Sequence, residues 1–354
     1  MRIVSPFLKR VLYPALSAAD FFSRAAASGL AVVTYHGVPP QGYQPIDAAL
    51  DGNLVSAETL RRQLRLLKTR YNVLSPEEVL SWREGRADLP PRAVLVTCDD
   101  GLLNCLTDML PVLQQEEVRC LFFVTGASVE DARATLWYED LLRLFLSAPV
   151  RRFEISSAGI TISNELASRD QRGKVWWKCV KRLSQVDAET RASFLSAARN
   201  ELGSSTWQSI DAENPAVCRR FGLLTCPELR ELEAAGMTIG AHTLSHPMLS
   251  QAPPGLARSE IAESCSKLES ELQSRVWAFA YPFGDAQSVT PEVMEMAKEA
   301  GYSLAFLNFG GGLGTALPPY AMPRLHVTSE MSLAEFEAHV SGFHMWLQRR
   351  AGRE

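Results

Sequence analysis

The stretch AVLVTCDDG, residues 93–101, decides the fold, because a run of apolar or near-apolar residues ends in two adjacent carboxylates and a glycine. A buried strand that ends in Asp99 and Asp100 holds two like charges at one sheet edge, which is unfavourable unless positive charge lies beside them. A metal ion would supply that charge. We therefore expect the carboxyl end of this strand to carry a functional site.

Six further segments are short, apolar and rich in β-forming residues, and most precede a helical pattern. Strands that alternate with helices indicate a parallel sheet with crossover connections. Seven strands fit a barrel better than a small open sheet, although an open doubly wound sheet is an alternative. The six segments are residues 29–38, 118–126, 236–243, 275–284, 302–310 and 321–327.

The helical patterns begin at capping residues such as Ser56, Ser75, Thr225, Thr290 and Ser332. The interval 127–224 breaks the strand and helix rhythm, with a predicted hairpin at 151–163 followed by helical, charge-rich sequence. We interpret it as an insertion between two barrel units, so that residues 29–354 form one barrel domain behind an N-terminal helix within residues 1–28. The predicted helices are 57–70, 76–84, 102–116, 225–235, 255–273, 290–300 and 332–348.

Composition places the 354-residue chain among ordinary globular proteins, since 46% of its residues are hydrophobic and 21% are charged. The net charge of −4 gives no basic excess for a nucleic-acid groove, so no nucleic-acid partner is expected. Seven cysteines at irregular spacing, without a CxxC pair, do not form a disulfide framework. They favour a reducing, cytoplasmic compartment.

Residues 5–28 read as an amphipathic helix that covers part of the domain. Charged residues at Lys9, Arg10, Asp20 and Arg24 interrupt the segment before a signal-peptide core of about 7–15 apolar residues is complete. No stretch reaches the roughly 18 apolar residues of a membrane span. Peripheral contact of residues 5–28 with the inner face of a membrane is the alternative to simple packing.

A second polar group follows another predicted strand, in the sequence HTLSH at residues 242–246. Histidines four apart can share one cation, and Pro247 favours a turn over a long helix there. Alone, such a pair is more often two core or solvent histidines. With one aspartate it makes a site of two nitrogens and one oxygen that leaves positions open for water and substrate. One of Asp99 and Asp100 can then bind the metal while the other acts as a base.

At these residues the chain resembles the polysaccharide deacetylases of the NodB-homology type, which are metal-dependent carbohydrate esterases. Thr97–Gly101 stands for the family's T-F-D-D-G motif, and His242–His246 for its H-[ST]-x-x-H motif. Residues 279–285, FAYPFGD, resemble the third motif. The resemblance covers about 30–126 and 222–327, and implies a distorted (β/α)7-type barrel with a mainly helical insertion.

Residue by residue, the resemblance implies that Asp100, His242 and His246 bind a divalent metal, usually zinc, and that Asp99 is the general base. The backbone N–H of Phe283 would stabilise the oxyanion. The chemistry is consistent, because such a metal acidifies water and polarises an acetyl carbonyl.

Two histidines compete as the general acid that a leaving amine requires. His326 matches the family's final L-x-H pattern with an offset of one residue, and His36 matches the tyrosine-histidine pair of the first strand in many bacterial members. Their alternative role is that of packed histidines at strand ends. The choice between them stays open.

The sequence departs from the family in three places. Cys98 replaces a phenylalanine, and no tryptophan-containing fourth motif is recognisable. Ala280 stands where many members have the arginine that orients the base. Arg324 is a candidate to supply that charge, with a surface ion pair as its alternative role.

The resemblance predicts a metal-dependent hydrolase that removes acetyl groups from N-acetylated sugars, in a surface polysaccharide or in its lipid-linked or oligosaccharide precursor. The nearby alternatives are an O-acetyl esterase or a non-sugar amidase with the same site. A catalytically silent carbohydrate-binding barrel is the alternative from a different class. The expected partner is therefore an N-acetylated oligo- or polysaccharide.

Overall fold

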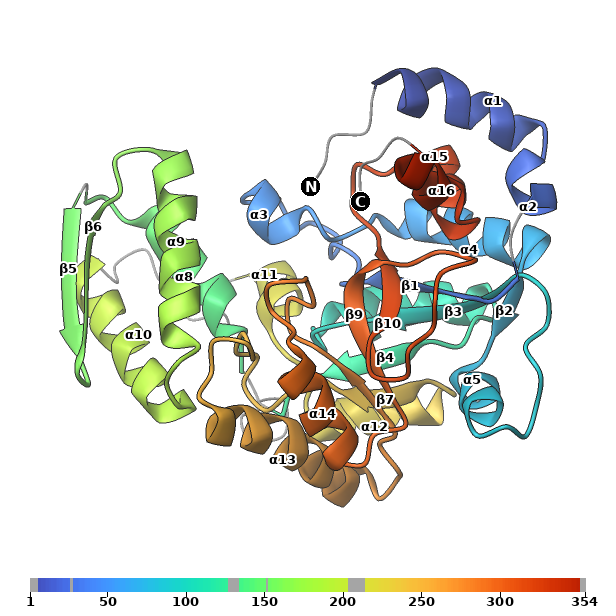
Figure 1. Ribbon diagram of the computed structural model, residues 1–354. Coiled ribbons are helices and arrows are strands. Elements are labelled where there is room, and N and C mark those ends of the chain that lie inside the picture. Colours follow the sequence, from blue (N-terminus) through green and yellow to red (C-terminus); the bar gives the residue numbers. More distant parts are fainter. Residues whose placement is uncertain (1–5, 26–27, 127–133, 151, 203–213, 351–354) are drawn as a thin grey trace.

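The structure is a computed structural model that describes residues 6–25, 28–126, 134–150, 152–202 and 214–350. Its main part is a barrel of parallel strands surrounded by helices, and the insertion forms a lobe beside it (Figure 1). In spatial order the barrel strands are β1 (Leu30–Tyr35), β10 (Met322–His326), β9 (Leu304–Gly310), β8 (Ala278–Ala280), β7 (Thr238–Ala241), β4 (Leu121–Val124) and β3 (Ala93–Cys98).

Pairing between β1 and β3 closes the barrel, since the two strands lie side by side in parallel from Leu30 and Ala93 to Tyr35 and Cys98. The predicted α/β barrel is confirmed, and each predicted strand is present. The sequence analysis missed β2 (Asn72–Leu74), which pairs with the first half of β3. Three residues give too short an apolar run to separate from the helices on either side.

Alternate residues of the strands fill the barrel. Val32 of β1 and Leu95 of β3 belong to the buried cluster inside it, whereas their neighbours Val33 and Val96 pack outward against the helices. Because side chains alternate along a strand, every second residue beyond these points also faces inward. This parity brings the side chains at the strand ends together over the mouth of the barrel.

Helices cover the outside of the barrel, and four of them begin with the predicted cap. Ser56, Ser75, Thr290 and Ser332 each accept a hydrogen bond from the backbone N–H three residues on. The helices outside the insertion and the N-terminal segment are α3 (Ala48–Asp51), α4 (Ala57–Arg70), α5 (Pro76–Arg83), the π-helix η2 (Cys105–Met109), α6 (Leu110–Gln115), α12 (Cys226–Ala234), α13 (Pro254–Leu272), α14 (Pro291–Glu299), α15 (Leu333–Val340) and α16 (Phe343–Arg350).

The single helix predicted over 332–348 is wrong, because the chain breaks it into α15 and α16 at Gly342. This glycine has φ +79°, and a Cβ there would lie 2.0 Å from the carbonyl oxygen of Leu313. Only glycine fits such a close approach at a left-handed backbone angle. The break lets α16 fold back beside α15.

The single N-terminal helix predicted within residues 5–28 is also broken. The described part consists of the π-helix η1 (Leu8–Leu12), α1 (Tyr13–Ala18) and α2 (Phe21–Ala25), with a turn at Asp20, whose φ is +54°. Residues 5, 26 and 27 lie outside the described residues. Within the described ranges, no helix combines the length and apolar character that a membrane span requires.

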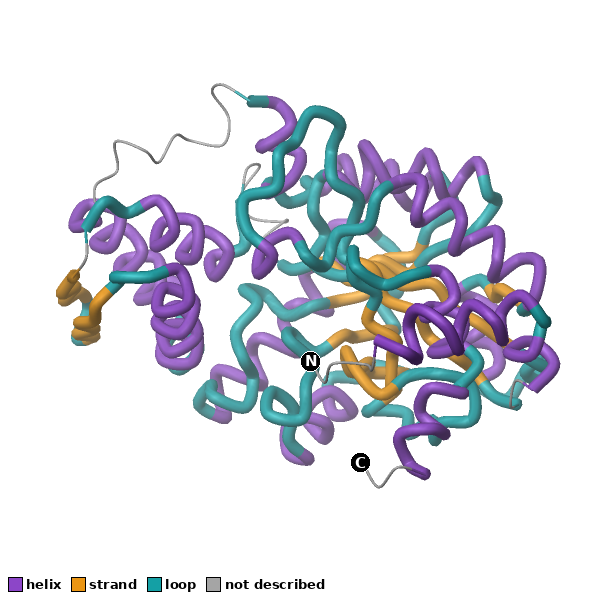
Figure 2. Tube along the Cα trace, turned by 90° about the horizontal axis from the view of Figure 1, so that it is seen from above, coloured by secondary structure: helices purple, strands orange, loops and turns teal. Residues whose placement is uncertain are grey.

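The insertion is a helical lobe with one hairpin and a hydrophobic cluster of its own. Figure 2, viewed from above, shows it standing beside the barrel. The predicted hairpin is confirmed and runs two residues further than expected. Of the predicted interval 127–224, residues 127–133, 151 and 203–213 lie outside the described residues. Its elements are α8 (Trp137–Ser147), β5 (Arg152–Ser157), β6 (Ile160–Glu165), α9 (Arg169–Leu183), α10 (Ala188–Leu202) and α11 (Pro215–Phe221).

A buried ion cluster joins the insertion to the loop that follows β1. Arg220 of α11, 1% exposed, donates to Asp51 (2.9 Å) and to Glu139 of α8 (2.8 Å). Tyr43 donates a further hydrogen bond to Asp51. Removing one partner from such a buried cluster leaves an uncompensated charge, which costs several kcal/mol. The cluster therefore fixes the lobe against the barrel.

Candidate active site

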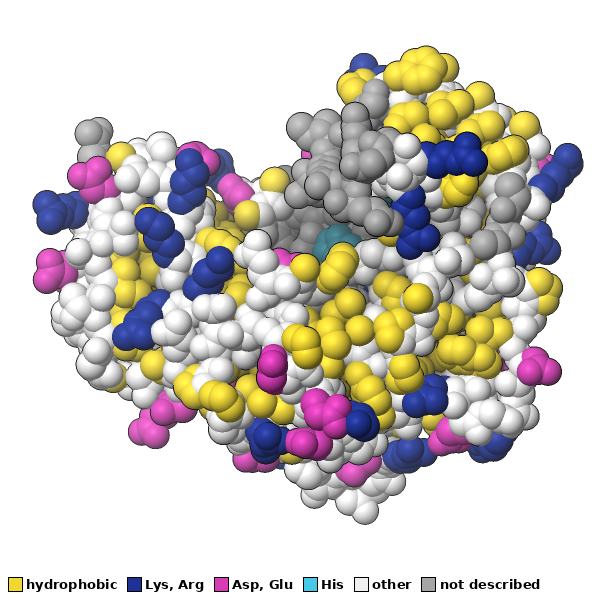
Figure 3. Space-filling model, in the orientation of Figure 1, with side chains coloured by type: hydrophobic (Ala, Val, Ile, Leu, Met, Phe, Trp, Pro, Cys, Tyr) yellow, Lys and Arg dark blue, Asp and Glu magenta, His cyan; other side chains and the backbone are white. Residues whose placement is uncertain are grey.

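The ends of four barrel strands bring the polar residues together. His36 follows β1, Asp99 follows β3, His242 follows β7, and His326 ends β10. All four lie an even number of residues from the inward-facing residues of their strands, so their side chains also face inward. Thr34 of β1 pairs with His326. The mouth of the barrel lies beside the insertion, where the surface is hollowed and a histidine side chain is visible (Figure 3).

Asp99 lies in a fully buried ion pair with Arg324. The guanidinium donates to both carboxylate oxygens, at 2.7 Å and 2.5 Å, and the two side chains are 2% and 0% exposed. Burial alone would raise the pKa of Asp99, but the Arg324 charge and its hydrogen bonds hold that pKa below the usual value. Asp99 is therefore ionised at neutral pH and fixed in orientation.

Arg324 is itself held in place inside the barrel. Its Nε donates to the carbonyl of Leu307 at 2.6 Å, and a terminal nitrogen reaches the Thr97 hydroxyl at 3.2 Å. The guanidinium also lies over the Phe123 ring, 5.3 Å from its centroid. The structure thus places the charge beside Asp99 from β10, while Ala280 occupies the third-motif position.

Asp100, His242 and His246 converge on one point. A carboxylate oxygen of Asp100 lies 3.6 Å from Nε2 of His242 and 3.3 Å from Nε2 of His246. All three side chains are buried, and their ligand atoms lie within 4.8 Å of one another. No other group of three or more potential metal ligands occurs in the described ranges.

This donor set fits a divalent cation. Nδ1 of His242 lies 2.6 Å from the carbonyl of Ala280, which accepts a hydrogen bond from the protonated Nδ1 and leaves the Nε2 lone pair free. Burial lowers the pKa of His246, so its ring is neutral. Burial opposes ionisation of Asp100, yet the neighbouring His242 and His246 bring its pKa well below the usual value. Two imidazole nitrogens and one carboxylate are a donor set that zinc and similar metals bind.

The backbone around the ligands is left-handed at several non-glycine positions. Asp100, Thr243 and His246 have φ of +76°, +64° and +56°. Such angles persist only where the surrounding structure enforces them, and they cluster at functional sites. At Gly101 a Cβ would lie 2.9 Å from the Val124 side chain, so the tight turn that aims the Asp100 carboxylate needs the motif glycine.

The two candidate acids lie side by side, with ring centroids 4.8 Å apart. The ring nitrogens of His326 lie 3.1 Å and 3.0 Å from the side-chain oxygens of Asn308 and Asn53. Burial, together with neighbouring His36, lowers the pKa of His326 to about 3. A neutral ring carries one N–H, so one of the two amides must present its nitrogen to it.

His36 differs from His326 because its Nδ1 is buried and has no hydrogen-bond partner among the described residues. An unpaired polar atom in such a place is costly unless a ligand or substrate uses it. His36 also lies close enough to lower the pKa of both Asp99 and Asp100. Nδ1 of His36 is therefore unpaired among the described residues, whereas both ring nitrogens of His326 have a partner.

Phe283 lies at the turn after β8, with φ +61°. Within the described ranges its backbone N–H donates to no backbone carbonyl, as required of a group kept for an oxyanion. Its ring packs edge-on against His246, with centroids 5.0 Å apart. The side chain thus closes one wall of the site while the main chain turns.

Cys98 is completely buried beside Asp99, and burial raises the pKa of its thiol well above the usual range. Because the thiolate is the reactive form, this cysteine behaves as a small packing residue. It fills the place of the family's phenylalanine.

The sequence analysis missed the part of the site that the insertion supplies. Tyr138 of α8 stacks on His246 with centroids 4.7 Å apart, and Trp137 donates its indole N–H to the His246 carbonyl at 3.2 Å. Trp177 of α9 packs edge-on against Phe283, so it supports the wall of the site. The aromatic pair Trp137 and Tyr138, within LWYED at residues 136–140, was the available signal. Nothing in the local pattern ties this pair to a loop about a hundred residues away.

A buried arginine of the insertion also holds the HTLSH loop. Arg191 of α10, 2% exposed, donates to the hydroxyl of Ser245, which donates to Glu260 of α13. The other Glu260 oxygen accepts from the Ser245 N–H at 2.8 Å. The strained loop that carries both histidine ligands is therefore fixed from two sides.

The fold and the site together form a (β/α) barrel whose mouth holds a candidate Asp, His, His metal site beside the buried Asp99 carboxylate. Residues 199–305 match the sequence model of the polysaccharide deacetylase family. This match agrees with the resemblance to polysaccharide deacetylases that the motifs predicted. The matched stretch contains the HTLSH and YPFG motifs but not residues 97–101, which the insertion separates from them.

Two curated relatives are similar to the chain. The putative polysaccharide deacetylase YxkH of Bacillus subtilis is 26% identical over 117 residues, which are 33% of this chain and 41% of that protein. The poly-β-1,6-N-acetyl-D-glucosamine N-deacetylase of Escherichia coli K12 is 22% identical over 323 residues, covering 88% of this chain and 38% of that protein. The chain thus spans about two fifths of the length of these relatives.

Solved structures support the fold. The deacetylase PplD of Streptococcus pyogenes, solved with acetate, superposes with a TM-score of 0.56 at 18% identity, covering 89% of this chain and 99% of that one. IcaB of Ammonifex degensii gives a TM-score of 0.54 at 19% identity, with 89% and 98% covered. The distorted (β/α) barrel expected from the motifs is thereby confirmed.

Proposed function

We propose that this protein is a metal-dependent hydrolase that removes acetyl groups from N-acetylated sugars. The observation that carries the proposal is the buried convergence of Asp100, His242 and His246 beside an ionised Asp99. Arg324 compensates the charge of Asp99, which leaves the Asp100 carboxylate and the two imidazoles to bind a cation. Asp100, His242 and His246 would hold it, and we take zinc as the preferred ion for two imidazoles and a carboxylate.

A divalent cation held there would polarise the acetyl carbonyl and make water more acidic. Asp99 would accept the proton of the attacking water, since each carboxylate oxygen keeps a further lone pair beside its bond from Arg324. The N–H of Phe283 would donate to the oxyanion of the tetrahedral intermediate. One of His36 and His326 would give a proton to the leaving nitrogen.

The proposed substrate is an N-acetylated oligo- or polysaccharide of the cell surface, or its lipid-linked precursor. One relative is named for deacetylation of poly-β-1,6-N-acetyl-D-glucosamine, which supports N-acetylglucosamine as the first sugar to test. All seven cysteines are free thiols, which supports a reducing compartment. We therefore propose action at the cytoplasmic face of the membrane on a precursor.

The first experiment measures acetate release from N-acetylglucosamine oligomers and from a lipid-linked N-acetyl sugar, with metal-free protein and with added zinc. The Asp99→Asn variant tests the base, and Asp170→Asn, on an exposed carboxylate of the insertion, is the matched control. We expect zinc-dependent release that Asp99→Asn abolishes and Asp170→Asn keeps.

The other outcomes are also decisive. Full metal occupancy without release from sugars would overturn the substrate and direct the search to O-acetyl esters and non-sugar amides. Neither release nor bound metal would overturn the catalytic proposal and favour a silent carbohydrate-binding barrel.

A further inference from the structure

The N-terminal segment exposes large apolar side chains on the outside of the molecule. Phe7 and Val11 are 61% and 53% exposed, and Phe21 of α2 and Trp346 of α16 are 39% and 48% exposed. We call these four residues the apolar patch. Only two other large hydrophobic side chains in the described part of the chain are exposed to a similar degree, Ile46 and Phe309.

Phe7 and Val11 of the apolar patch lie on a different face of the N-terminal segment from the side chains that pack on the protein. Tyr13 and Phe22 are completely buried against Ala338 of α15, with Leu8 and Leu16 beside them. Phe7 and Val11 are one helical turn apart and lie outside this cluster. The helix therefore has a second apolar face, which the fold does not use.

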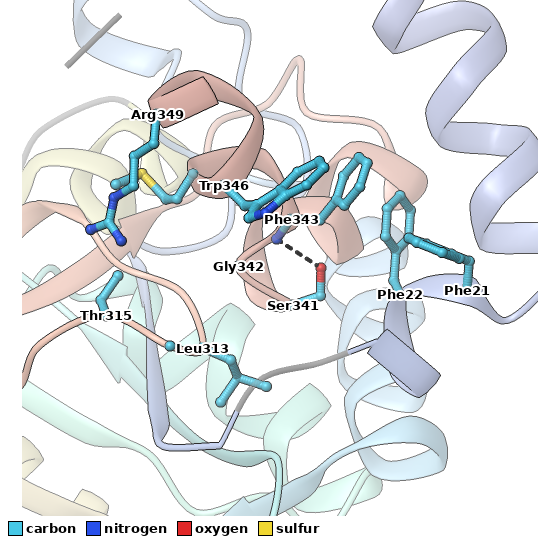
Figure 4. Close-up of a pocket in the computed structure, with 11 residues that line it drawn as sticks. Phe21, Phe22, Leu313, Thr315, Ser341, Gly342, Phe343, Trp346 and Arg349 are labelled. Atoms are coloured by element: carbon cyan, nitrogen blue, oxygen red, sulfur yellow. Dashed lines mark hydrogen bonds between the residues drawn. The ribbon is translucent and has the colours of Figure 1, made fainter. Parts of the chain in front are cut away.

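An aromatic group joins the N-terminal segment to the C-terminal helix. The Phe343 ring lies between Phe21, at 5.6 Å, and Trp346, at 5.5 Å between centroids (Figure 4). Together they line a cavity of about 380 Å³ that also includes Leu313 and Arg349. Indole and phenyl rings at a polar boundary are typical of proteins that lie at a membrane interface.

Exposed arginines lie on the same helices as the residues of the apolar patch: Arg10 on η1, Arg24 on α2 and Arg350 on α16. Arg10 and Arg24 are exposed, and neither forms an ion pair with any residue that the structure describes. Arg350 lies over the Trp346 ring, 4.6 Å from its centroid. The nearby acids are already paired, Asp20 with Arg70 and Glu335 with Lys9. Unpaired positive charge from Arg10 and Arg24 therefore lies on the helices that carry the patch, although the whole chain has a net charge of −4.

We propose that the apolar patch and its arginines dock the protein on the surface of an anionic lipid bilayer. The aromatic and aliphatic side chains would enter the boundary between headgroups and acyl chains, while the arginines bind lipid phosphates. A symmetric contact between two copies would bring the arginine rims face to face, so the charge favours lipid over a second copy. This proposal stands whether or not the deacetylase activity is found.

The test is sedimentation of the 354-residue protein with sucrose-loaded vesicles of phosphatidylglycerol and phosphatidylcholine in equal parts, at 50 mM and 500 mM salt. We expect binding at low salt, at least tenfold less at high salt, and little binding to phosphatidylcholine alone. The double variant Phe7→Ser with Val11→Ser, and separately Arg10→Glu, should each reduce binding about tenfold.

Ile46→Ser is the matched control, since Ile46 is 39% exposed and lies on the loop after β1. It should bind vesicles as the unchanged protein does, and circular dichroism should show that all variants are folded. Equal binding of the double variant and the control would overturn the proposal. A stable dimer that the double variant dissociates, without vesicle binding, would assign the patch to self-association instead.

Discussion

Arg324 supplies the positive charge beside Asp99 that the third motif does not supply, because Ala280 stands at the motif position. The pair forms across the barrel interior, from the end of β3 to β10, with both side chains excluded from water. A buried ion pair adds little net stability relative to apolar residues, but breaking it from one side is costly. The pair therefore makes both a stability and an activity prediction.

We expect Arg324→Met to lower the free energy of unfolding by about 3–5 kcal/mol, because it leaves the Asp99 carboxylate buried without a partner. The measurement is urea denaturation followed by circular dichroism. Adding Asp99→Asn to this variant removes the uncompensated charge, so it should recover part of the stability and none of the activity. An unchanged stability of Arg324→Met would contradict the ion pair.

We expect His36, and not His326, to protonate the leaving group, since both ring nitrogens of His326 are bonded and its pKa is about 3. His36→Asn should then slow the release of acetate from an N-acetyl sugar by roughly 10²–10⁴-fold. Its effect on an activated acetate ester, whose leaving group needs no proton, should be small. The reverse pattern in His326→Asn would assign the acid to that residue.

Among single residues, those of the motifs could be predicted, since the parallel strands bring Asp100 and His242 to the same end of the barrel. The partner of Asp99 could not be chosen, because Arg324 is one of several arginines and its inward direction follows from the register of β10. The buried Nδ1 of His36 likewise appears only when all its neighbours are placed.

The insertion contributes to the site through whole elements. Helices α8 and α10 hold the HTLSH loop by Trp137 and Arg191, and Ser184 at the end of α9 accepts from the N–H of Met248 at 2.9 Å. Because two residues of this loop have positive φ, its conformation depends on such outside support. The insertion thus supports the loop that carries two of the candidate metal ligands.

We expect Trp137→Phe to weaken zinc binding about tenfold, the lower range for residues that orient metal ligands. The change removes the hydrogen bond to the His246 carbonyl and keeps the aromatic packing. Zinc affinity is measured by competition with a coloured chelator. Trp82→Phe in α5, partly buried against the barrel cluster, is the matched control. Equal zinc affinity in the two variants would show that the insertion does not support the loop.

Element prediction succeeded where apolar runs were long and failed where a single residue interrupts the pattern. The seven strands carry clear β-rich segments, whereas Gly342 and Asp20 break helices whose hydrophobic spacing continues past them. Hydrophobic periodicity records which face is buried and carries no information about a local turn. The contacts of the insertion were beyond prediction because they are all long-range.

Across the whole molecule, three histidines link the barrel to the terminal helices. His326, His339 and His344 line one cavity of about 790 Å³. The rings of His339 and His344 stack at 3.9 Å, and Tyr13 of α1 lies 2.7 Å from Nδ1 of His344. Burial, with His344 beside it, lowers the pKa of His339 from 6.5 to about 3. These rings are neutral in the folded protein.

The unfolded chain binds a proton at His339 near pH 6.5, whereas the folded protein binds it only near pH 3. Stability from this residue is therefore complete above pH 6.5 and is lost as the pH falls from 6.5 towards 3. Between pH 7.5 and 5.5 this amounts to about 1.4 kcal/mol. The measurement is urea denaturation at both pH values with a chelator present. The free energy of unfolding of His339→Gln should fall by about 1.4 kcal/mol less over this interval than that of the unchanged protein. Equal losses would show that His339 is already charged in the folded state.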